Sequence, residues 1–233
     1  MGLGTKVIDL RKLLAERFPH PTSPATSVLH TGLSFLDQSS GGGLRKSAIT
    51  ELITPRRSAG SASLIHALLQ SAQRDRHFVA LIDGSDSFDP GSSDNSALRH
   101  LLWIRCRKAS DAIKAADLLL RDDNFPLVVV DLVLNTEQEL RKIPQTSWYR
   151  LQRLVEAVST ACLVINRQSL VSSAQLKIVL ENSWTLSDLE KQNVILDMRF
   201  RIPAIASQSR GHKSAVRRSE LYGGKPWACC ESV

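Results

Sequence analysis

Short apolar runs alternate with helical stretches through the middle of the chain. The apolar runs are 49–53, 78–83, 101–105, 127–133 and 161–166. The stretches between them carry apolar residues at helical spacing, namely Leu64, Ile65, Leu68, Leu69 and Ala72; Ala112, Ile113, Ala116, Leu119 and Leu120; and Trp148, Leu151, Leu154, Val155 and Val158. Strands that are apolar throughout and separated by amphipathic helices are typical of a parallel sheet covered on both faces. The pattern therefore predicts an α/β fold.

The two ends of the chain depart from this alternation. Leu10, Leu13, Leu14 and Phe18 are near helical spacing, so residues 5–18 are expected to form an amphipathic helix, ended by a linker that contains Pro19, Pro21 and Pro24. That helix packs either on its own domain or on a neighbouring subunit. The runs 175–186 and 193–202 have no helix between them and predict a hairpin that extends the sheet. We expect a helix and linker over 1–24, a core over 25–202 and a tail over 203–233.

Charge is concentrated near the C-terminus. From Arg199 to Lys225 the chain has seven basic residues and one acidic residue, whereas the net charge of the whole chain is +7. A basic tail beside a nearly neutral core is typical of contact with nucleic acid or with an acidic protein; the alternative is a solvated tail without a partner. The tail residues expected to contact DNA phosphates are Arg210, Lys213, Arg217 and Arg218.

Nothing in the composition indicates a membrane, a metal or an oxidising compartment. No apolar run approaches the roughly 18 residues needed to span a bilayer, and Asp9, Arg11 and Lys12 interrupt the N-terminal apolar residues. Cys106 and Cys162 lie in apolar runs and are expected to be buried thiols. No cysteine or histidine spacing completes a zinc site. We therefore expect a cytoplasmic protein without a bound metal.

Several segments resemble the core of RecA-family recombinases, in the same order along the chain. TGLSFLDQSSGGGLRKSAITELITP at 31–55 is similar to the segment that leads into the phosphate loop, and ALIDGSDSFDP at 80–90 resembles the second strand and its loop. LVVVDLV at 127–133 looks like the strand with the magnesium-associated aspartate, and 163–166 with 175–186 look like the late strand and hairpin. The resemblance covers about residues 5–200. It implies a RecA-like P-loop NTPase core.

The residues at the expected nucleotide site depart from the family's pattern. A working phosphate loop reads GxxxxGK[ST], because its glycines turn N–H groups onto the phosphates and its lysine reaches the terminal ones. In this chain only Gly60 remains; Ser61 takes the lysine position, and Ala62 takes the metal-binding hydroxyl position. The glutamate that activates water is replaced by Ser85, with Asp86 beside it. The residues that the resemblance places at this vestigial site are Thr54, Pro55, Arg56, Arg57, Ser58, Gly60, Ser61, Ala62, Ser63, Asp89 and Asp131.

These losses predict that ATP hydrolysis is absent or near background. Phosphoryl transfer depends on positioning and charge stabilisation, and each missing electrostatic element costs about 10²–10³ in rate. Arg56 and Arg57 either supply positive charge to a bound phosphate or simply face solvent. We expect no cofactor, while weak binding of ATP and magnesium stays open.

The resemblance also implies two DNA-contacting loops. The first corresponds to about 134–147, which has mixed charge, and the second lies between Asn166 and Lys177. The second is short for a recombinase, and its obvious phosphate or base partners are Arg167 and Gln168. Strand exchange is therefore not expected, and the basic tail is the favoured contact with DNA.

A short RecA-like chain with a degenerate phosphate loop and a basic C-terminus resembles the ImuA family. The resemblance implies an accessory protein of the bacterial DNA-damage (SOS) response, which supports translesion mutagenesis beside polymerase-type partners. Residues 5–18 are then the candidate interface with a second copy or a RecA-like partner. Two alternatives stay open: an ATP-binding recombinase that acts on single-stranded DNA, and a cell-division inhibitor similar to SulA.

Overall fold

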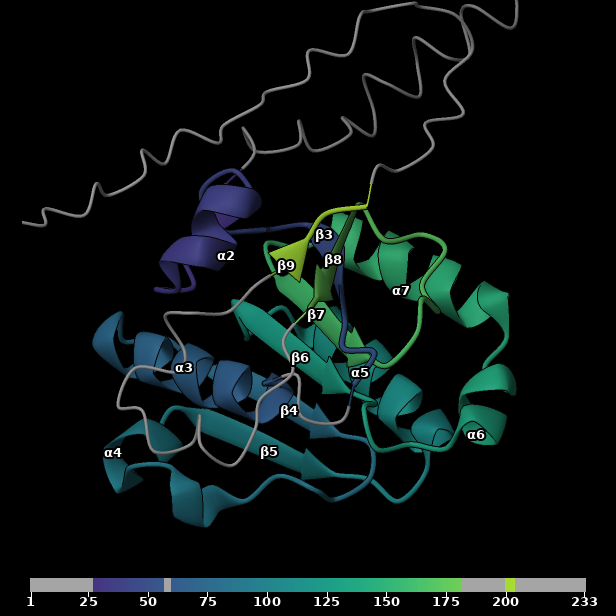
Figure 1. Cartoon of the computed structure of the whole chain (residues 1–233), viewed down its shortest axis with the longest axis horizontal. Helices are drawn as coiled ribbons and strands as arrows, with labels where there is room; N and C mark the ends of the chain where they lie inside the picture. Colours follow the sequence, from purple (N-terminus) through teal and green to yellow (C-terminus); the bar gives the residue numbers. More distant parts are fainter. Residues whose placement is uncertain (1–26, 57–59, 182–199, 204–233) are drawn as a thin grey trace, which may run out of the picture. The chain divides into compact units, whose positions relative to one another are not determined.

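The computed structural model describes residues 27–56, 60–181 and 200–203. Within these residues a seven-stranded sheet runs in the order β5-β4-β6-β7-β3-β8-β9 (Figure 1). Every neighbouring pair is parallel except β8 with β9. The strands are β3 (Ala48–Ile53), β4 (Val79–Asp83), β5 (Leu101–Arg105), β6 (Leu127–Asp131), β7 (Ala161–Asn166), β8 (Leu176–Leu180) and β9 (Phe200–Arg201). The expected mostly parallel α/β sheet is confirmed.

The central strands are apolar throughout because each contributes to two cores. Successive side chains of a strand point to opposite faces. Accordingly, Leu81 of β4 belongs to the core on one face and Ile82 to the core on the other, and Leu163 and Val164 of β7 divide in the same way. All residues of β3, β4 and β7 are buried. Such strands cannot lie with one face in water, so helices must cover both sides.

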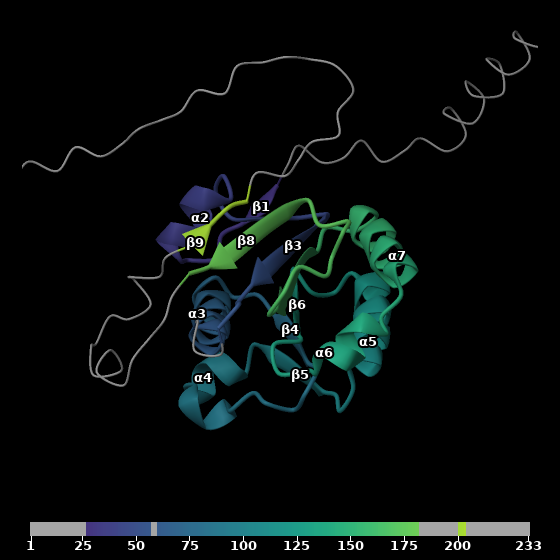
Figure 2. The ribbon, with the colours of Figure 1, turned by 45° about the vertical axis from the view of Figure 1, so that its right-hand side comes forward.

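Three longer helices provide that cover. They are α3 (Ser61–Arg74), α5 (Ala109–Asp122) and α7 (Gln145–Glu156). Figure 2 shows α3 on one side of the strands and α5 with α7 on the other. The apolar faces predicted from helical spacing are the buried ones; in α7, for example, Trp148, Leu151 and Val155 are buried. Burying such side chains on folding supplies roughly 1.5–3 kcal/mol each.

The remaining elements are too short for periodicity to reveal. They are β1 (Val28–Leu29), α2 (Ser34–Ser39), β2 (Leu44–Arg45), the 3₁₀ turn Pro90–Ser92, α4 (Asn95–Leu98) and α6 (Glu137–Arg141). The last of these corrects the treatment of 134–147 as a loop. Thr136 and Glu139 form a capping box, in which the Thr136 side chain accepts from the Glu139 N–H and the Glu139 carboxylate accepts from the Thr136 N–H. The segment is thereby held in a fixed conformation.

Several predictions concern segments that the structure describes only in part. The expected hairpin is confirmed at its ends, where Val179 pairs with Arg201 and Leu180 with Phe200, and residues 182–199 between them are outside the described residues. The helix predicted over 5–18 and tail residues 204–233 also lie outside. All described residues belong to one compact unit, and none of their helices has the length and apolarity to cross a membrane. The proposed domain limits stay predictions.

Candidate functional site

The residues expected at the nucleotide site follow strands that all end at one edge of the sheet. Thr54 follows β3, Gly84 follows β4, Asp131 ends β6 and Asn166 ends β7. Because these strands are parallel, their carboxyl ends meet at the same edge, which is where ligands bind in open α/β sheets. Figure 1 shows the arrowheads of β4, β5 and β6 directed toward this edge. The structure therefore places two of the predicted residues, Thr54 and Asp131, at the edge where ligands bind in such sheets, beside Gly84 and Asn166.

The loop after β3 closes onto β7. Thr54 is fully buried, and both its N–H and its hydroxyl donate to the Asn166 carbonyl oxygen, at 2.7 and 3.1 Å. Pro55 and Arg56 are exposed, and Arg57 and Ser58 lie outside the described residues. Thr54 or Pro55 stands where the family's pattern has the first glycine, depending on where a one-residue difference in length is placed. The Thr54 side chain is therefore occupied by the sheet.

The described residues resume at Gly60, which directly precedes α3. Gly60 has a φ of 96°, a left-handed conformation that glycine adopts without strain, and it is the N-cap residue of the helix. Ser61 and Ser63 are half-buried, and Ala62 is exposed. A helix N-terminus attracts phosphate through its free N–H groups. None of these three side chains, however, adds a positive charge.

The loop after β4 is built around a buried carboxylate that the motif analysis did not single out. Asp83 is 1% exposed, and its oxygens accept from the N–H groups of Ser85, Ser87 and Phe88 at 2.7–3.2 Å. The Trp103 indole N–H also donates to it, at 3.4 Å. These donors satisfy the buried charge, as burial of a carboxylate requires. Asp83 thus determines the shape of this loop.

The carboxylates near the position of the catalytic glutamate, Asp86 and Asp89, are bound by other groups of the chain. Asp86 is adjacent to Ser85, but Arg105 binds it through two guanidinium nitrogens, one at 2.7 Å. The hydrogen bonds from Arg105 lower the pKa of Asp86, which makes its carboxylate a weaker base. Asp89 is exposed and accepts from the Gly91 N–H at 2.9 Å, so it caps a turn.

Asp131 is the carboxylate that the resemblance associates with magnesium. Asp131 is half-buried, and its Oδ1 accepts from the Val133 N–H at 3.0 Å. Burial raises the pKa of Asp131 to about 6, and the neighbouring Asp83 carboxylate adds to this rise against the effect of the Val133 hydrogen bond. Asp83 and Asp131 are register partners in adjacent strands, which explains the repulsion.

This pKa predicts a pH-dependent cost of keeping Asp131 charged. A folded-state pKa above the unfolded value means that ionisation opposes folding above about pH 6, and the cost fades as pH falls toward 4. Asp131→Asn retains the acceptor oxygen. It should therefore stabilise the protein by about 2 kcal/mol at pH 8 and by almost nothing at pH 4. Urea denaturation at both pH values measures the difference, and an equal effect at both would contradict the assignment.

Glu51 is a second buried carboxylate that the motif analysis missed. It lies in the centre of β3 with no exposed surface, and Lys177 Nζ is 2.9 Å from its Oε2. The other groups that donate to its carboxylate are Asn166 Nδ2 (3.0 Å), Ser169 Oγ (3.2 Å), Leu170 N (2.6 Å) and Val171 N (2.9 Å). Glu51 thereby ties the loop after β7 to the middle of the sheet. A glutamate in an otherwise apolar strand was the signal that could have revealed it.

The loop held by Glu51 contains the predicted DNA contacts. Arg167 is exposed and Gln168 is half-buried. A cleft of about 180 Å³ joins them to the loops after β3 and β6, and it is lined by Pro55, Asn135, Glu137, Leu140, Arg167 and Gln168. The other predicted contacts (Arg210, Lys213, Arg217 and Arg218) lie outside the described residues.

Asn135 connects two of these loops. It is 7% exposed, and its Nδ2 donates to the Gly84 carbonyl oxygen at 2.8 Å. Position 84 tolerates only glycine, because a Cβ there would lie 2.3 Å from Asn135 Oδ1. This contact fixes the loop after β4 against the loop after β6.

These residues are a poor fit for a magnesium nucleotide. The positions that would hold the terminal phosphates and the metal carry Ser61 and Ala62, and the Ala62 side chain has no ligand atom. Asp131 remains as a carboxylate, although its raised pKa opposes the charged form that magnesium requires. Within the described ranges, no cluster of three or more histidine, cysteine, aspartate or glutamate residues could hold a metal ion.

Comparison with known proteins supports the resemblance found in the sequence. No family model matches the chain. Curated proteins named Protein RecA are similar to it: 26% identical over 157 residues in Chlorobaculum tepidum (60% of this chain, 45% of that protein), 27% over 119 residues in Nostoc sp. (50% and 33%) and 32% over 110 residues in Clavibacter michiganensis (46% and 30%). The chain spans less than half the length of these relatives.

Proposed function

Because this chain has a RecA-like core, we propose that it is a DNA-associated accessory protein of the bacterial DNA-damage (SOS) response that does not hydrolyse ATP. It would support translesion mutagenesis by contacting DNA and polymerase-type partners. The RecA relatives motivate the association with DNA. The state of the carboxyl edge motivates the absence of hydrolysis.

The observation that carries this proposal is that the carboxyl edge is held together by its own residues. Glu51 binds the loop after β7, and Thr54 binds the Asn166 carbonyl oxygen. A nucleotide-driven switch needs loops that change conformation when the terminal phosphate is bound or lost. Arg167 stands at the position where the RecA family has a nucleotide-sensing residue. The residue before it, Asn166, donates from its Nδ2 to Glu51 inside the sheet. These contacts within the chain are what hold the loop after β7.

We expect no ATP hydrolysis because the charged side chains that catalyse it are missing from this chain. The glutamate position carries Ser85, and Arg105 holds the adjacent Asp86. The lysine position carries Ser61. Two missing electrostatic elements lower the rate of phosphoryl transfer by about 10⁴-fold or more.

Calorimetric titration with Mg-ATP, and with a non-hydrolysable analogue, tests this proposal. We expect no heat of binding up to millimolar nucleotide, with or without single-stranded DNA. Ser61→Lys combined with Ala62→Thr is the matched gain-of-function variant, since it restores both lost side chains. We expect it to bind nucleotide measurably better than the wild-type protein.

Micromolar binding by the wild-type protein, weakened by Arg56→Ala and Arg57→Ala, would contradict the proposal. It would mean that the two arginines supply the missing positive charge. The chain would then be an ATP-binding RecA-type protein, and a single-stranded-DNA-dependent ATPase assay would be the next measurement.

A further inference from the structure

A second polar surface lies at the opposite edge of the sheet, where the strands begin. The segments at this edge include the end of β2 with the turn into β3, the end of α3 with the turn into β4, and the end of α4 with the turn into β5. In Figure 1 the starts of β4, β5 and β6 lie on the left, away from their arrowheads. Five strand residues separate the two edges, a span of about 16 Å. The surface is therefore distinct from the candidate nucleotide site.

This surface, which we call the amino-edge patch, carries five basic residues. They are Arg45, Lys46, Arg74, Arg76 and Arg99; all are exposed except the half-buried Lys46. Of the five, only Arg74 has an ion-pair partner within the described part of the chain, namely Asp75. The side chains of the other four form no ion pair with any described residue.

The electrostatic neighbours of His77 place these segments together. Burial lowers the pKa of His77, and the nearby positive groups of His100 and Lys46 lower it further against the effect of Asp75. His77 thus has residues of the β2–β3 turn and of the α4–β5 turn around it. Arg74 reaches toward the segment before α2, since a Cβ on Gly32 would lie 2.5 Å from its guanidinium. The basic residues therefore come from three segments spread along this edge, from the start of β3 to the start of β5.

An exposed aromatic ring lies among these cations. Phe78 is 52% exposed although it directly precedes a fully buried strand, and its ring centroid is 5.5 Å from that of His100. His100 is held in turn by a contact of 3.1 Å between its Nδ1 and the His77 carbonyl oxygen. The Phe78 ring is therefore in contact with a held neighbour, while about half of the side chain stays in water. An exposed phenylalanine has no role in the core.

We propose that the amino-edge patch binds single-stranded nucleic acid, with phosphates on the basic residues and a base stacked on Phe78. Basic residues interleaved with an accessible aromatic ring are what non-specific binding of single strands requires, because every base has a π-face. An acidic protein segment would satisfy the cations, but it would leave the flat face of Phe78 without a matching ring. The choice of DNA over RNA rests on the proposed function.

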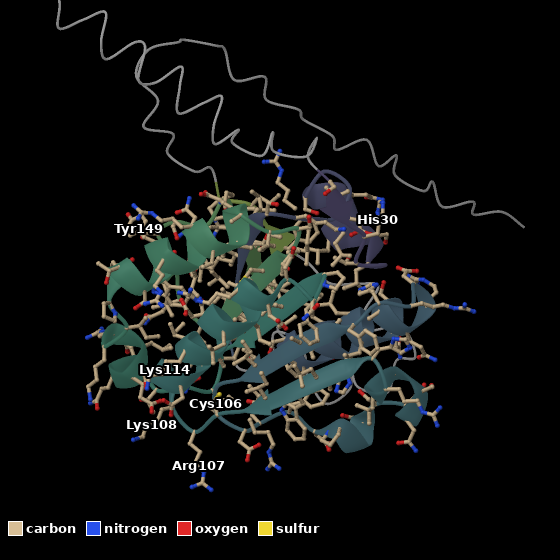
Figure 3. All side chains as sticks on the ribbon, turned by 180° about the vertical axis from the view of Figure 1, so that it is seen from behind. His30, Cys106, Arg107, Lys108, Lys114 and Tyr149 are labelled. Atoms are coloured by element: carbon tan, nitrogen blue, oxygen red, sulfur yellow. The ribbon has the colours of Figure 1, made fainter. Side chains whose placement is uncertain are left out.

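The negative charges nearby delimit the patch. Asp75 is bound to Arg74. Asp122 and Asp123 lie at the end of α5, a helix on the opposite face of the sheet from α3 (Figure 2), and Asp123 accepts from the Ser159 N–H and the Thr160 hydroxyl just before β7. Figure 3, seen from behind, shows His30 toward the amino side and Arg107 and Lys108 near the carboxyl ends of the strands. We therefore expect the bound nucleic acid to cross the amino edge of the sheet on the side that α3 covers.

Fluorescence anisotropy with the full chain and a labelled oligothymidylate, at several salt concentrations, tests the proposal. The triple variant Arg45→Ser, Arg76→Asn and Arg99→Ser should bind at least tenfold more weakly and reduce the slope of log affinity against log salt by about 2. Asparagine suits position 76 because Arg76 has a φ of 55°. Phe78→Ala should weaken binding about tenfold without changing the salt slope.

The matched control removes three other exposed charges, which lie beyond the carboxyl ends of β5 and β6: Arg107→Ser, Lys108→Ser and Lys142→Ser. An equal loss of affinity in the control and in the patch triple variant would overturn the proposal, since net charge alone would explain it. So would wild-type affinity in the Phe78→Ala variant. An acidic polypeptide whose binding depends equally on Phe78 would assign the patch to a protein partner instead.

A tail variant separates this inference from the proposed function. If replacing Arg210, Lys213, Arg217 and Arg218 by serine removes binding while the patch triple variant binds normally, the patch inference is wrong and the DNA association stands. If the wild-type protein does not bind the oligonucleotide, both fail. Loss in the patch variants with a normal tail variant supports the inference.

Discussion

Replacing Glu51 by alanine is expected to lower the free energy of unfolding by about 3–5 kcal/mol. Removing one member of a buried ion pair leaves its partners without compensation, and here these are Lys177 and the N–H groups of Leu170 and Val171. Urea denaturation measures this loss, and for a domain of this size the melting temperature should fall by about 10 °C.

Two further variants show which part of the contact matters. Glu51→Gln keeps an acceptor for the backbone N–H groups but removes the charge, so it should cost less, about 1–2 kcal/mol. Glu181→Gln is the surface control, because its pair with Arg201 is exposed and should contribute less than about 1 kcal/mol. If Glu51→Ala cost no more than Glu181→Gln, the idea that Glu51 anchors the loop after β7 would be wrong.

The second large effect is expected at Trp148. This side chain is 1% exposed and packs in the core between α5, α7 and the sheet. Trp148→Ala creates a cavity as well as losing burial, and it should lower the free energy of unfolding by about 3–5 kcal/mol. Thermal and urea denaturation of the full chain both measure this change.

The adjacent residue provides a matched control. Tyr149 lies in the same helix and is 50% exposed, so Tyr149→Ala should change the free energy of unfolding by less than about 1 kcal/mol. Similar costs for the two variants would contradict the division of α7 into a buried and an exposed face.

Two buried carboxylates hold loops at the carboxyl edge through contacts within the chain. Glu51 fixes the loop after β7, and Asp83 fixes the loop after β4 through N–H groups of Ser85, Ser87 and Phe88. Both loops lie at the carboxyl edge, where a bound phosphate would otherwise order them. Intrinsic anchoring of this kind is consistent with a scaffold whose surfaces do not depend on ATP.

The alternation of apolar runs and amphipathic helices was sufficient to predict the sheet and its covering helices. That is because β3, β4, β6 and β7 lie inside the sheet and are buried almost throughout, and largely apolar runs of this kind fit a parallel sheet covered on both faces. Segment order alone also indicated which loops meet at the carboxyl edge, since parallel strands all end there. The departures at Ser61, Ala62 and Ser85 are likewise facts of the sequence.

What a side chain does at either edge depended on the tertiary structure. Glu51 has no local partner, because its donors come from residues up to 120 positions away. Asp83 binds N–H groups of the loop that directly follows it, but its burial depends on the packed sheet. Helix α6 is too short to show a helical period of apolar residues, and its capping box stabilises it instead. The amino-edge patch combines residues from three separate segments, so no window of sequence contains it. Charge and pattern are local properties, whereas the pairing of a buried charge and the arrangement of surface cations are decided only when the strands are brought together.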